Sequence, residues 1–105
     1  MSKNKNEIIT QSLIFDNVSN IIETRKANAG AYANREVTLM YWEVGHYINS
    51  VVLNSSRAAY GKRIITELAS KLMTKYGKTF NIHNLRRMMR FAEKFDDFQI
   101  NLSLV

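Results

Sequence analysis

The sequence contains no cysteine and no proline, and only four of its 105 residues are glycine. Without cysteine, neither a disulfide framework nor a thiolate metal site can form. Proline and glycine are the residues that most often interrupt regular structure. Their scarcity beside many Ile, Leu, Met, Ala, Lys and Glu residues predicts an all-α protein.

Long apolar segments are also missing. No apolar run approaches the roughly 18 residues that a membrane-spanning helix needs. The polar opening MSKNKNEII lacks the apolar core and the cleavage site of a secretory signal. We therefore expect a cytoplasmic protein with no membrane partner.

The motifs of common enzymes are absent as well. The sequence has no glycine-rich phosphate loop, no HExxH, no GxSxG, and no Asp/Glu-x-Lys triplet of the kind that metal-dependent nuclease cores use. Glu43 and His46 lie one helical turn apart, but two ligands with no further acid or histidine nearby are too few for a metal site. The sequence predicts a protein that is not an enzyme, with no cofactor, metal or small-molecule substrate.

Charge is distributed unevenly along the chain, whose formal net charge is +6. Residues 1–56 are neutral, whereas residues 57–94 carry ten Lys/Arg against two Glu, a balance of +8. A basic second half indicates a surface that faces a polyanion. DNA is the expected partner, with an acidic protein or an anionic membrane surface as alternatives.

Apolar residues recur at helical spacing in four segments, at about residues 7–29, 33–53, 57–76 and 82–95 of one domain that covers residues 1–105. One continuous helix over the first two segments would be about 70 Å long. A globular chain of this size has a radius of gyration of only about 13 Å. We predict a break near residues 28–34, with a projecting helix that pairs with a second chain as the alternative.

Small and polar residues mark the expected helix ends. Asn54, Ser55 or Ser56 can cap the third helix, and Asn81 can cap the fourth. Gly77 suits the left-handed backbone that ends a helix. The last two helices, about five residues apart, suit a helix-turn-helix-like pair. Within the second helix, Gly45 would permit close approach of another helix.

The final segment is sharply two-sided on a helical wheel. Its apolar face holds Ile82, Leu85, Met88, Met89, Ala92 and Phe95. Its polar face holds His83, Arg86, Arg87, Arg90, Glu93 and Lys94. A solvated helix face is the simplest interpretation. However, arginine pairs with phosphates and with guanine edges, and the second helix of a helix-turn-helix enters the DNA groove.

The preceding segment adds further basic residues, so the charge is regional. We predict a nucleic-acid-binding surface made of Arg86, Arg87, Arg90, Lys94 and His83, supported by Lys62, Arg63, Lys71, Lys75 and Lys78. Two Asn–Arg sets have another interpretation, as buried polar anchors between helices: Asn34 with Arg35, and Asn84 with Arg86.

Three stretches, RKANAGAYANREVTLMYWEVGHYI, YGKRIITELASKL and FNIHNLRRMMRFAEKF, resemble in this order the N-terminal domain of the YhcG family. The resemblance covers about residues 14–98. It implies a helix-turn-helix-like module that binds DNA and usually precedes a C-terminal nuclease domain of the PDDEXK superfamily. The matching positions are Asn34, Tyr41, Trp42, Gly45, Tyr60, Gly61, Leu68, Phe80, Asn84, Leu85, Met88 and Phe91.

Most of these motif positions are apolar, which indicates packing, and none is a catalytic residue of the family. The chain ends at FQINLSLV, before any nuclease domain. The neutral first half, rich in Tyr, Trp and Ile, favours a second function, a protein-interaction or oligomerisation module. In that case the first two helices could form a homodimer.

Overall fold

The computed structural model describes residues 5–28, 33–53 and 58–95. The helices are α1 (Lys5–Ala27), α2 (Ala33–Leu53), α3 (Ala58–Tyr76) and α4 (Ile82–Lys94), with a short 3-10 helix, η2 (Lys78–Phe80), before α4. Within the described residues there is no strand, and the predicted all-α fold of about four helices is confirmed. The expected caps Asn54, Ser55 and Ser56 lie outside the described residues.

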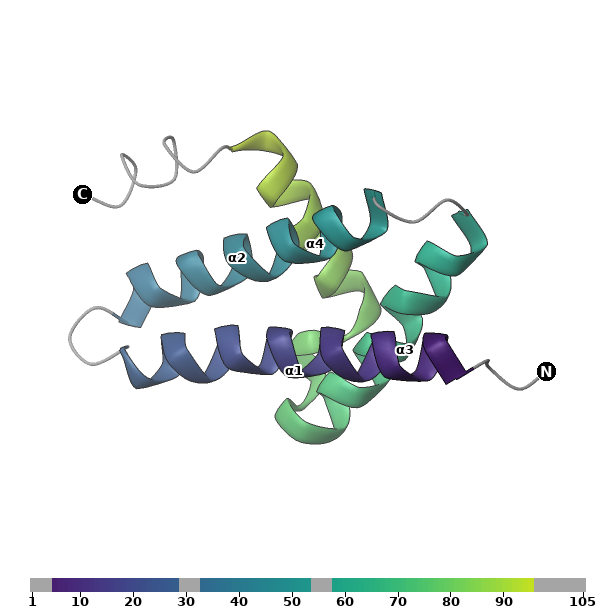
Figure 1. Ribbon diagram of the computed structural model, residues 1–105. Coiled ribbons are helices and arrows are strands. Elements are labelled where there is room, and N and C mark those ends of the chain that lie inside the picture. The colour runs from purple at the N-terminus through teal and green to yellow at the C-terminus, as the bar shows by residue number, and fades with distance from the viewer. Residues whose placement is uncertain (1–4, 29–32, 54–57, 96–105) are drawn as a thin grey trace.

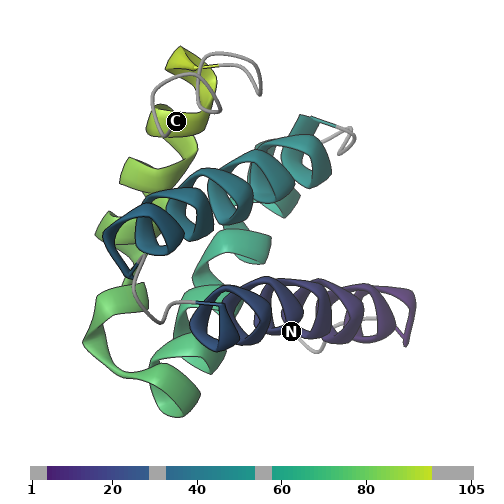
Figure 2. The ribbon, with the colours of Figure 1, turned by 90° about the vertical axis from the view of Figure 1, so that its left-hand side faces the viewer.

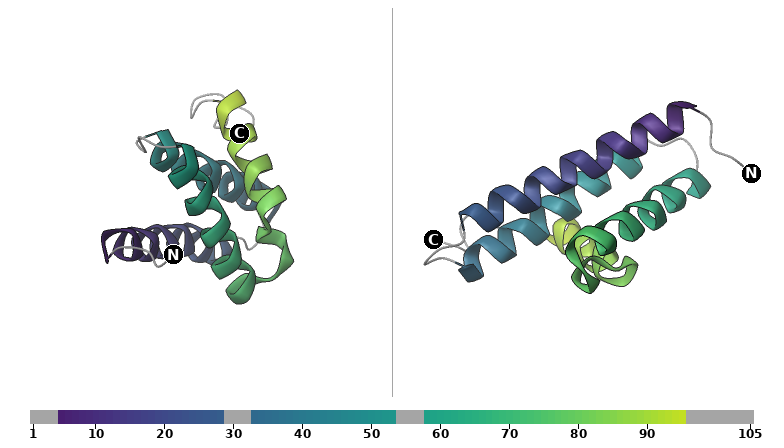
Figure 3. Two further views of the ribbon diagram at one scale, coloured as in Figure 1. Left: turned by 90° about the vertical axis from the view of Figure 1, so that its right-hand side faces the viewer. Right: turned by 90° about the horizontal axis from the view of Figure 1, so that it is seen from below.

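The first two helices form an antiparallel pair (Figure 1). The predicted separation into two helices is therefore confirmed, and the radius of gyration is 14.1 Å. Figure 2 shows α2 between α1 and α4, and α2 contacts all three other helices. From α3 the chain turns back into α4, so that the two helices form a V (Figure 3).

Each helix contributes one apolar stripe to a common core. Residues spaced three or four apart share one side of a helix, so the stripes of the four helices can face one another. The buried members of this core are Ile14, Val18, Ile22, Met40, Val44, Ile48, Ile64, Ile65, Leu68, Ala69, Leu72, Phe80, Leu85 and Met88. Trp42 and Ala92 form a second, smaller cluster between α2 and α4, with Leu39 and Phe91 beside them.

Gly45 brings the backbones of α2 and α4 into direct contact. A Cβ atom at this position would overlap the carbonyl group of Met88 and lie 2.8 Å from the backbone nitrogen of Met89. Only glycine, which has no side chain, allows the two helices to approach this closely. The predicted close approach at Gly45 is confirmed, and the partner helix is α4.

Two hydrogen bonds flank this contact along the same side of α2. One turn before Gly45, the indole Nε1 of Trp42 donates to the carbonyl oxygen of Phe95 at 2.8 Å. One turn after it, Nδ2 of Asn49 donates to the carbonyl oxygen of Met89 at 2.9 Å. Helix α4 packs more extensively on α2 than on α3, although α3 precedes it in the chain.

The turn before α4 is built as the sequence predicts. Gly77 has a positive φ of 90°, and Asn81 caps α4 by accepting from the backbone N–H of Asn84 at 2.8 Å. In addition, Nδ2 of Asn84 donates to the carbonyl oxygen of Thr79 at 2.9 Å. These bonds fix the direction in which α4 leaves the turn.

The expected apolar face of α4 requires one correction. Phe95 does not continue this face, because α4 ends at Lys94 and Phe95 has an extended backbone. Its side chain is 38% exposed. The carbonyl oxygen of Phe95 is bound by Trp42, and this bond holds the chain where it leaves the helix.

An ion cluster joins α1 to α2. Arg25 donates from Nε to Glu43 at 2.6 Å and from Nη1 to Glu36 at 2.9 Å, and its Nη2 also pairs with Glu43. Burial by itself lowers the pKa of Arg25, but the hydrogen bonds and charges of Glu43 and Glu36 outweigh it and raise this pKa. The cluster connects the end of α1 with the first half of α2.

We expect Gly45→Ala to lower the free energy of unfolding by about 3 kcal/mol, since the new methyl group forces α2 away from α4. In an exposed helix the same change from glycine to alanine would raise the free energy of unfolding by about 1 kcal/mol. Urea unfolding followed by circular dichroism measures the difference.

Gly61→Ala is the matched control, because Gly61 is also a buried glycine within a helix. Its Cβ atom would lie 3.2 Å from a methyl carbon of Val52, a side-chain tip that can shift. We expect this variant to stay within about 1 kcal/mol of the wild type. A Gly45→Ala variant as stable as Gly61→Ala would contradict the backbone contact.

Candidate nucleic-acid interface

The polar face of α4 is fully presented to solvent. His83, Arg86, Arg87, Arg90 and Lys94 are all exposed. Beneath them, Leu85, Met88 and Ala92 are buried against the rest of the protein. The helix thus carries four cations and one histidine on a rigid apolar floor.

The cations of α3 do not form one group. Lys62 and Arg63 lie near its beginning, where they line a shallow depression with Thr66 and Glu67. The guanidinium of Arg63 lies 5.6 Å from the centre of the Tyr60 ring. Lys78 is exposed on η2.

Lys71 and Lys75 are directed at α1. Their Nζ atoms lie 5.9 and 5.7 Å from the centre of the Phe15 ring. Cations at this distance from an aromatic face are attracted by it. These two lysines therefore belong to a surface shared with α1, whereas the arginines belong to α4, which packs mainly on α2.

The same surface includes Glu23 and Tyr76. The hydroxyl of Tyr76 donates to the carboxylate of Glu23 at 2.6 Å. The Nζ atoms of Lys26 and Lys75 lie 5.5 and 5.2 Å from the centre of the Tyr76 ring. This hydrogen bond, together with the charges of the two lysines, lowers the pKa of Glu23 against a smaller opposing effect of burial. The lysines here are thus partly engaged with groups of the protein itself.

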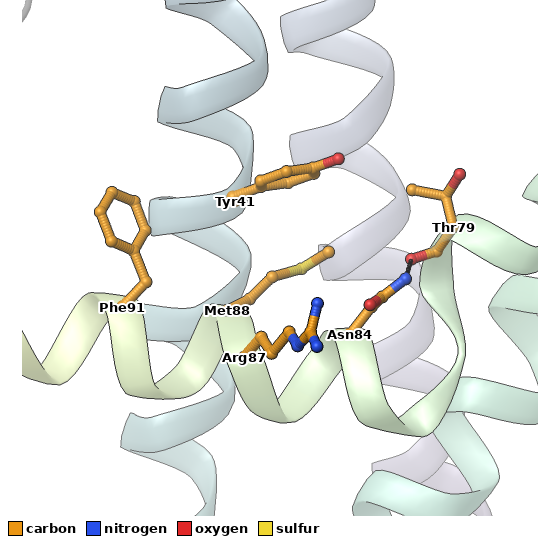
Figure 4. A pocket seen from close by; sticks show the side chains of 6 residues that line it. All are labelled: Tyr41, Thr79, Asn84, Arg87, Met88 and Phe91. Carbon is orange, nitrogen blue, oxygen red and sulfur yellow. Dashed lines mark hydrogen bonds between the residues drawn. The ribbon is translucent and has the colours of Figure 1, made fainter.

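A groove of about 360 Å³ lies between α2, the turn before α4 and one side of α4 (Figure 4). It is lined by Tyr41, Thr79, Asn84, Arg87, Met88 and Phe91. The Tyr41 ring lies across from the side chain of Met88, with its hydroxyl directed toward Thr79, and the Arg87 guanidinium lies between Met88 and Asn84. Arg87 is therefore both part of the basic face and part of the groove.

Sequence reasoning did not find this groove. Its residues come from three separate elements, and Thr79 has no distinctive pattern around it. One signal was present: Tyr41, Asn84, Met88 and Phe91 are all positions of the motif that resembles the YhcG family. These positions were interpreted as packing residues, and the structure shows that they pack and also border an open site.

The two residues considered as a metal pair, Glu43 and His46, contact different partners. Glu43 is bound by Arg25, while His46 stacks on Trp42 with ring centres 4.6 Å apart. No group of three or more His, Asp or Glu side chains that could hold a metal ion occurs among the described residues.

The remaining motif positions lie mostly in the packed part of the protein. Trp42 and Leu85 are buried, Gly61 packs on Val52, and Tyr60 lies at the edge of the core.

None of the four residues of the two Asn–Arg sets is a buried anchor between helices. Asn84 is half-buried and hydrogen-bonded within the turn before α4, whereas Asn34, Arg35 and Arg86 are exposed. Asn34 lies near the beginning of α2, where its carbonyl oxygen accepts from Thr38, and Arg86 lies on the outer face of α4. The interpretation of these Asn–Arg sets as buried anchors between helices is therefore wrong.

The family can be identified at this point. The profile of the DUF1016 N-terminal domain matches residues 17–105. This chain belongs to the DUF1016 N-terminal domain family. The resemblance to the N-terminal domain of the YhcG family is thereby confirmed.

One curated relative supports this assignment. Over 92 residues, the DUF1016 N-terminal domain described here is 27% identical to the Escherichia coli (strain K12) protein named "Putative nuclease YhcG". The match covers 87% of this chain and 24% of the relative, so the chain spans about a quarter of that protein. No solved structure is significantly similar to the chain described here. Within the described residues, none of the helices combines the length and apolar character needed to cross a membrane.

We expect the Tyr76–Glu23 bond to make stability depend on pH. Because the pKa of Glu23 is lower in the folded state than its ordinary value of 4.5, the unfolded state binds more protons in this range. The stabilisation is complete above about pH 4.5 and is lost as the pH falls through the lower, folded-state pKa. Tyr76→Phe should therefore be less stable than the wild type at pH 7, and the difference should shrink in acid.

Urea midpoints measured from pH 7 to pH 3 test this expectation. Tyr41→Phe is the control, because the Tyr41 hydroxyl has no hydrogen-bond partner among the described residues. Its difference from the wild type should not change with pH. A Tyr76→Phe difference that is equally large at both ends of the range would contradict the link to Glu23.

Proposed function

We propose that this domain is a non-catalytic, helix-turn-helix-like module that binds DNA and serves as the targeting part of a nuclease-associated protein. The observation that carries the proposal is the exposed face of α4, which combines three arginines, a lysine and a histidine on a helix held firmly by α2.

The dimensions of α4 suit this role. Its 13 residues make a rod about 20 Å long, and an α-helix with its side chains, about 10–12 Å across, fits the major groove of B-DNA. Arginine forks can bind phosphate oxygens or guanine edges in two-point contacts. Arg86, Arg87 and Arg90 are the residues expected to do so, with His83 and Lys94 at the two ends of the face.

The cations outside α4 have supporting roles. Lys62, Arg63 and Lys78 lie on α3 and η2, which lead into α4, and are expected to bind phosphates on either side of the contact. Lys71 and Lys75 would extend the surface toward α1. Such phosphate contacts position a protein on DNA without reading its sequence.

The link to a nuclease rests on the relative. The protein named as a nuclease is about four times as long as the match, so a domain of this kind would bind DNA while another part of such a protein acts on it. The proposed module itself is not an enzyme and needs no cofactor. A DNA partner agrees with the cytoplasmic location expected from the sequence.

We expect Arg90→Ala to weaken binding of a DNA duplex and to reduce its salt dependence. Each phosphate that the protein neutralises releases counterions, so losing one contact should reduce the slope of log K against log[salt] by about 1. Fluorescence anisotropy with a labelled duplex, between about 50 and 200 mM salt, measures both quantities.

Arg35→Ala is the charge-matched control. Arg35 is also an exposed arginine, but it lies near the beginning of α2 and is not part of the basic face of α4. It should leave the affinity and the slope unchanged. Absence of DNA binding at low salt would overturn the proposal, and equal effects of the two substitutions would assign binding to overall charge instead of α4.

A second candidate is self-association through α1 and α2. Three large apolar side chains on these helices face solvent: Leu13 at 56%, Val37 at 41% and Leu53 at 82% exposure. Against this, Ile14, Val18 and Val44 of the same helices are used in the internal core. These three core residues are therefore not available for a homodimer.

Light scattering across a range of protein concentrations distinguishes this candidate. If α1 and α2 form a homodimer, Leu13→Lys should shift the mass toward the monomer, while Met73→Lys, an equally drastic change on α3, should not. A monomer mass that does not change with concentration would overturn self-association.

A further inference from the structure

The groove between α2 and α4 combines an aromatic surface with polar groups, several of which make no hydrogen bond to the described residues. Tyr41, Met88 and Phe91 provide the apolar part, and Thr79, Asn84 and Arg87 provide the polar part (Figure 4). A cleft of mostly apolar lining with a few convergent polar groups is the usual form of a site for a small molecule or a single chemical unit. Its volume, about 360 Å³, also lies in that range.

The polar groups of the groove are available for a ligand. Among the described residues, no hydrogen bond is made by the Tyr41 hydroxyl, the Thr79 hydroxyl or the Arg87 guanidinium. The Asn84 amide donates to the carbonyl oxygen of Thr79, which fixes its orientation and keeps its oxygen as an acceptor. Within the described part of the chain, the groove therefore offers donors and acceptors that no other side chain occupies.

The chemistry of the groove selects its occupant. Tyrosine and phenylalanine rings accept a planar base by stacking, polar groups match the hydrogen-bonding edge of the base, and an arginine binds the phosphate that follows it. Arg86 and Arg90 lie next to Arg87 on the outer face of α4 and would bind the phosphates of the same strand. A strand lying along α4 would thus pass the opening of the groove.

We propose that the groove binds one unpaired nucleotide of DNA, with its base beside Tyr41 and Phe91 and its phosphate at Arg87. This inference rests on the proposed DNA-binding function and adds a structural preference to it. A paired base must first be unstacked and unpaired before it can enter a pocket, whereas an unpaired base avoids most of this cost. The domain should therefore prefer DNA with an unpaired nucleotide over an intact duplex.

Three DNA ligands with the same base-paired sequence test the preference. One is a perfect duplex, the second has a single extra, unpaired nucleotide, and the third has an abasic residue at that unpaired position. We expect the second to bind about tenfold more tightly than the first, as one base stacked on an aromatic ring provides. The abasic ligand has the same extra backbone unit but no base, and it should bind like the perfect duplex.

Three variants locate the effect. Arg87→Gln and Arg90→Gln remove the same charge from the same helix, but only Arg87 lines the groove. Arg90→Gln should weaken binding of all three ligands by the same factor, whereas Arg87→Gln should also reduce the preference. Tyr41→Leu should abolish the preference and leave duplex binding unchanged. If Tyr41→Leu proves unstable, Arg87→Gln still tests the groove, because Arg87 is exposed and its replacement does not disturb the core.

The outcomes separate the two proposals. Equal affinity for the three ligands would overturn the groove assignment and leave the DNA-binding function in place. A preference that persists for the abasic ligand, or in both Arg87→Gln and Tyr41→Leu, would also overturn the assignment, because it would depend on DNA flexibility. Failure to bind any of the three would overturn the proposed function, and the groove assignment with it.

Discussion

The contact between the backbones of α2 and α4 at Gly45 is the constraint on which the rest of the structure depends. Two helices cannot approach this closely across a side chain, so one missing methyl group sets the position of α4. The bonds from Trp42 and Asn49, one turn away on either side, then determine how far α4 slides along α2. Everything presented by α4 has its place because of this contact.

The functional surfaces follow from that placement. The apolar side of α4 is buried in the core, and the arginines on its opposite side are exposed. The same crossing leaves Tyr41 of α2 opposite Met88 of α4, and a groove remains between them that side chains do not fill. The basic face and the groove meet at Arg87. Meanwhile, the Arg25 cluster secures α1 to α2 at a different surface, away from both features.

Much of the fold was predictable because its signals are local. The apolar spacing of residues 33–53, the positive φ at Gly77 and the cap at Asn81 depend only on near neighbours in the chain. The face of α4 was also predictable, since a helical wheel needs no tertiary information. The exception is Phe95, which has an extended backbone and whose carbonyl oxygen accepts a hydrogen bond from Trp42, 53 positions earlier. The glycine at position 45 indicated a close approach, but its partner could not be read from the sequence.

The sequence by itself determined the all-α class, the division into helices and the collection of positive charge in the second half, because these depend on composition and on spacing within single segments. Only the tertiary structure decided which cations share a surface. Lys71 and Lys75 lie over Phe15 of α1, while Arg87 lies at a groove formed with α2. Long-range packing determines this grouping of the cations, because the side of a helix that faces a neighbour depends on which helices cross it and at which residue.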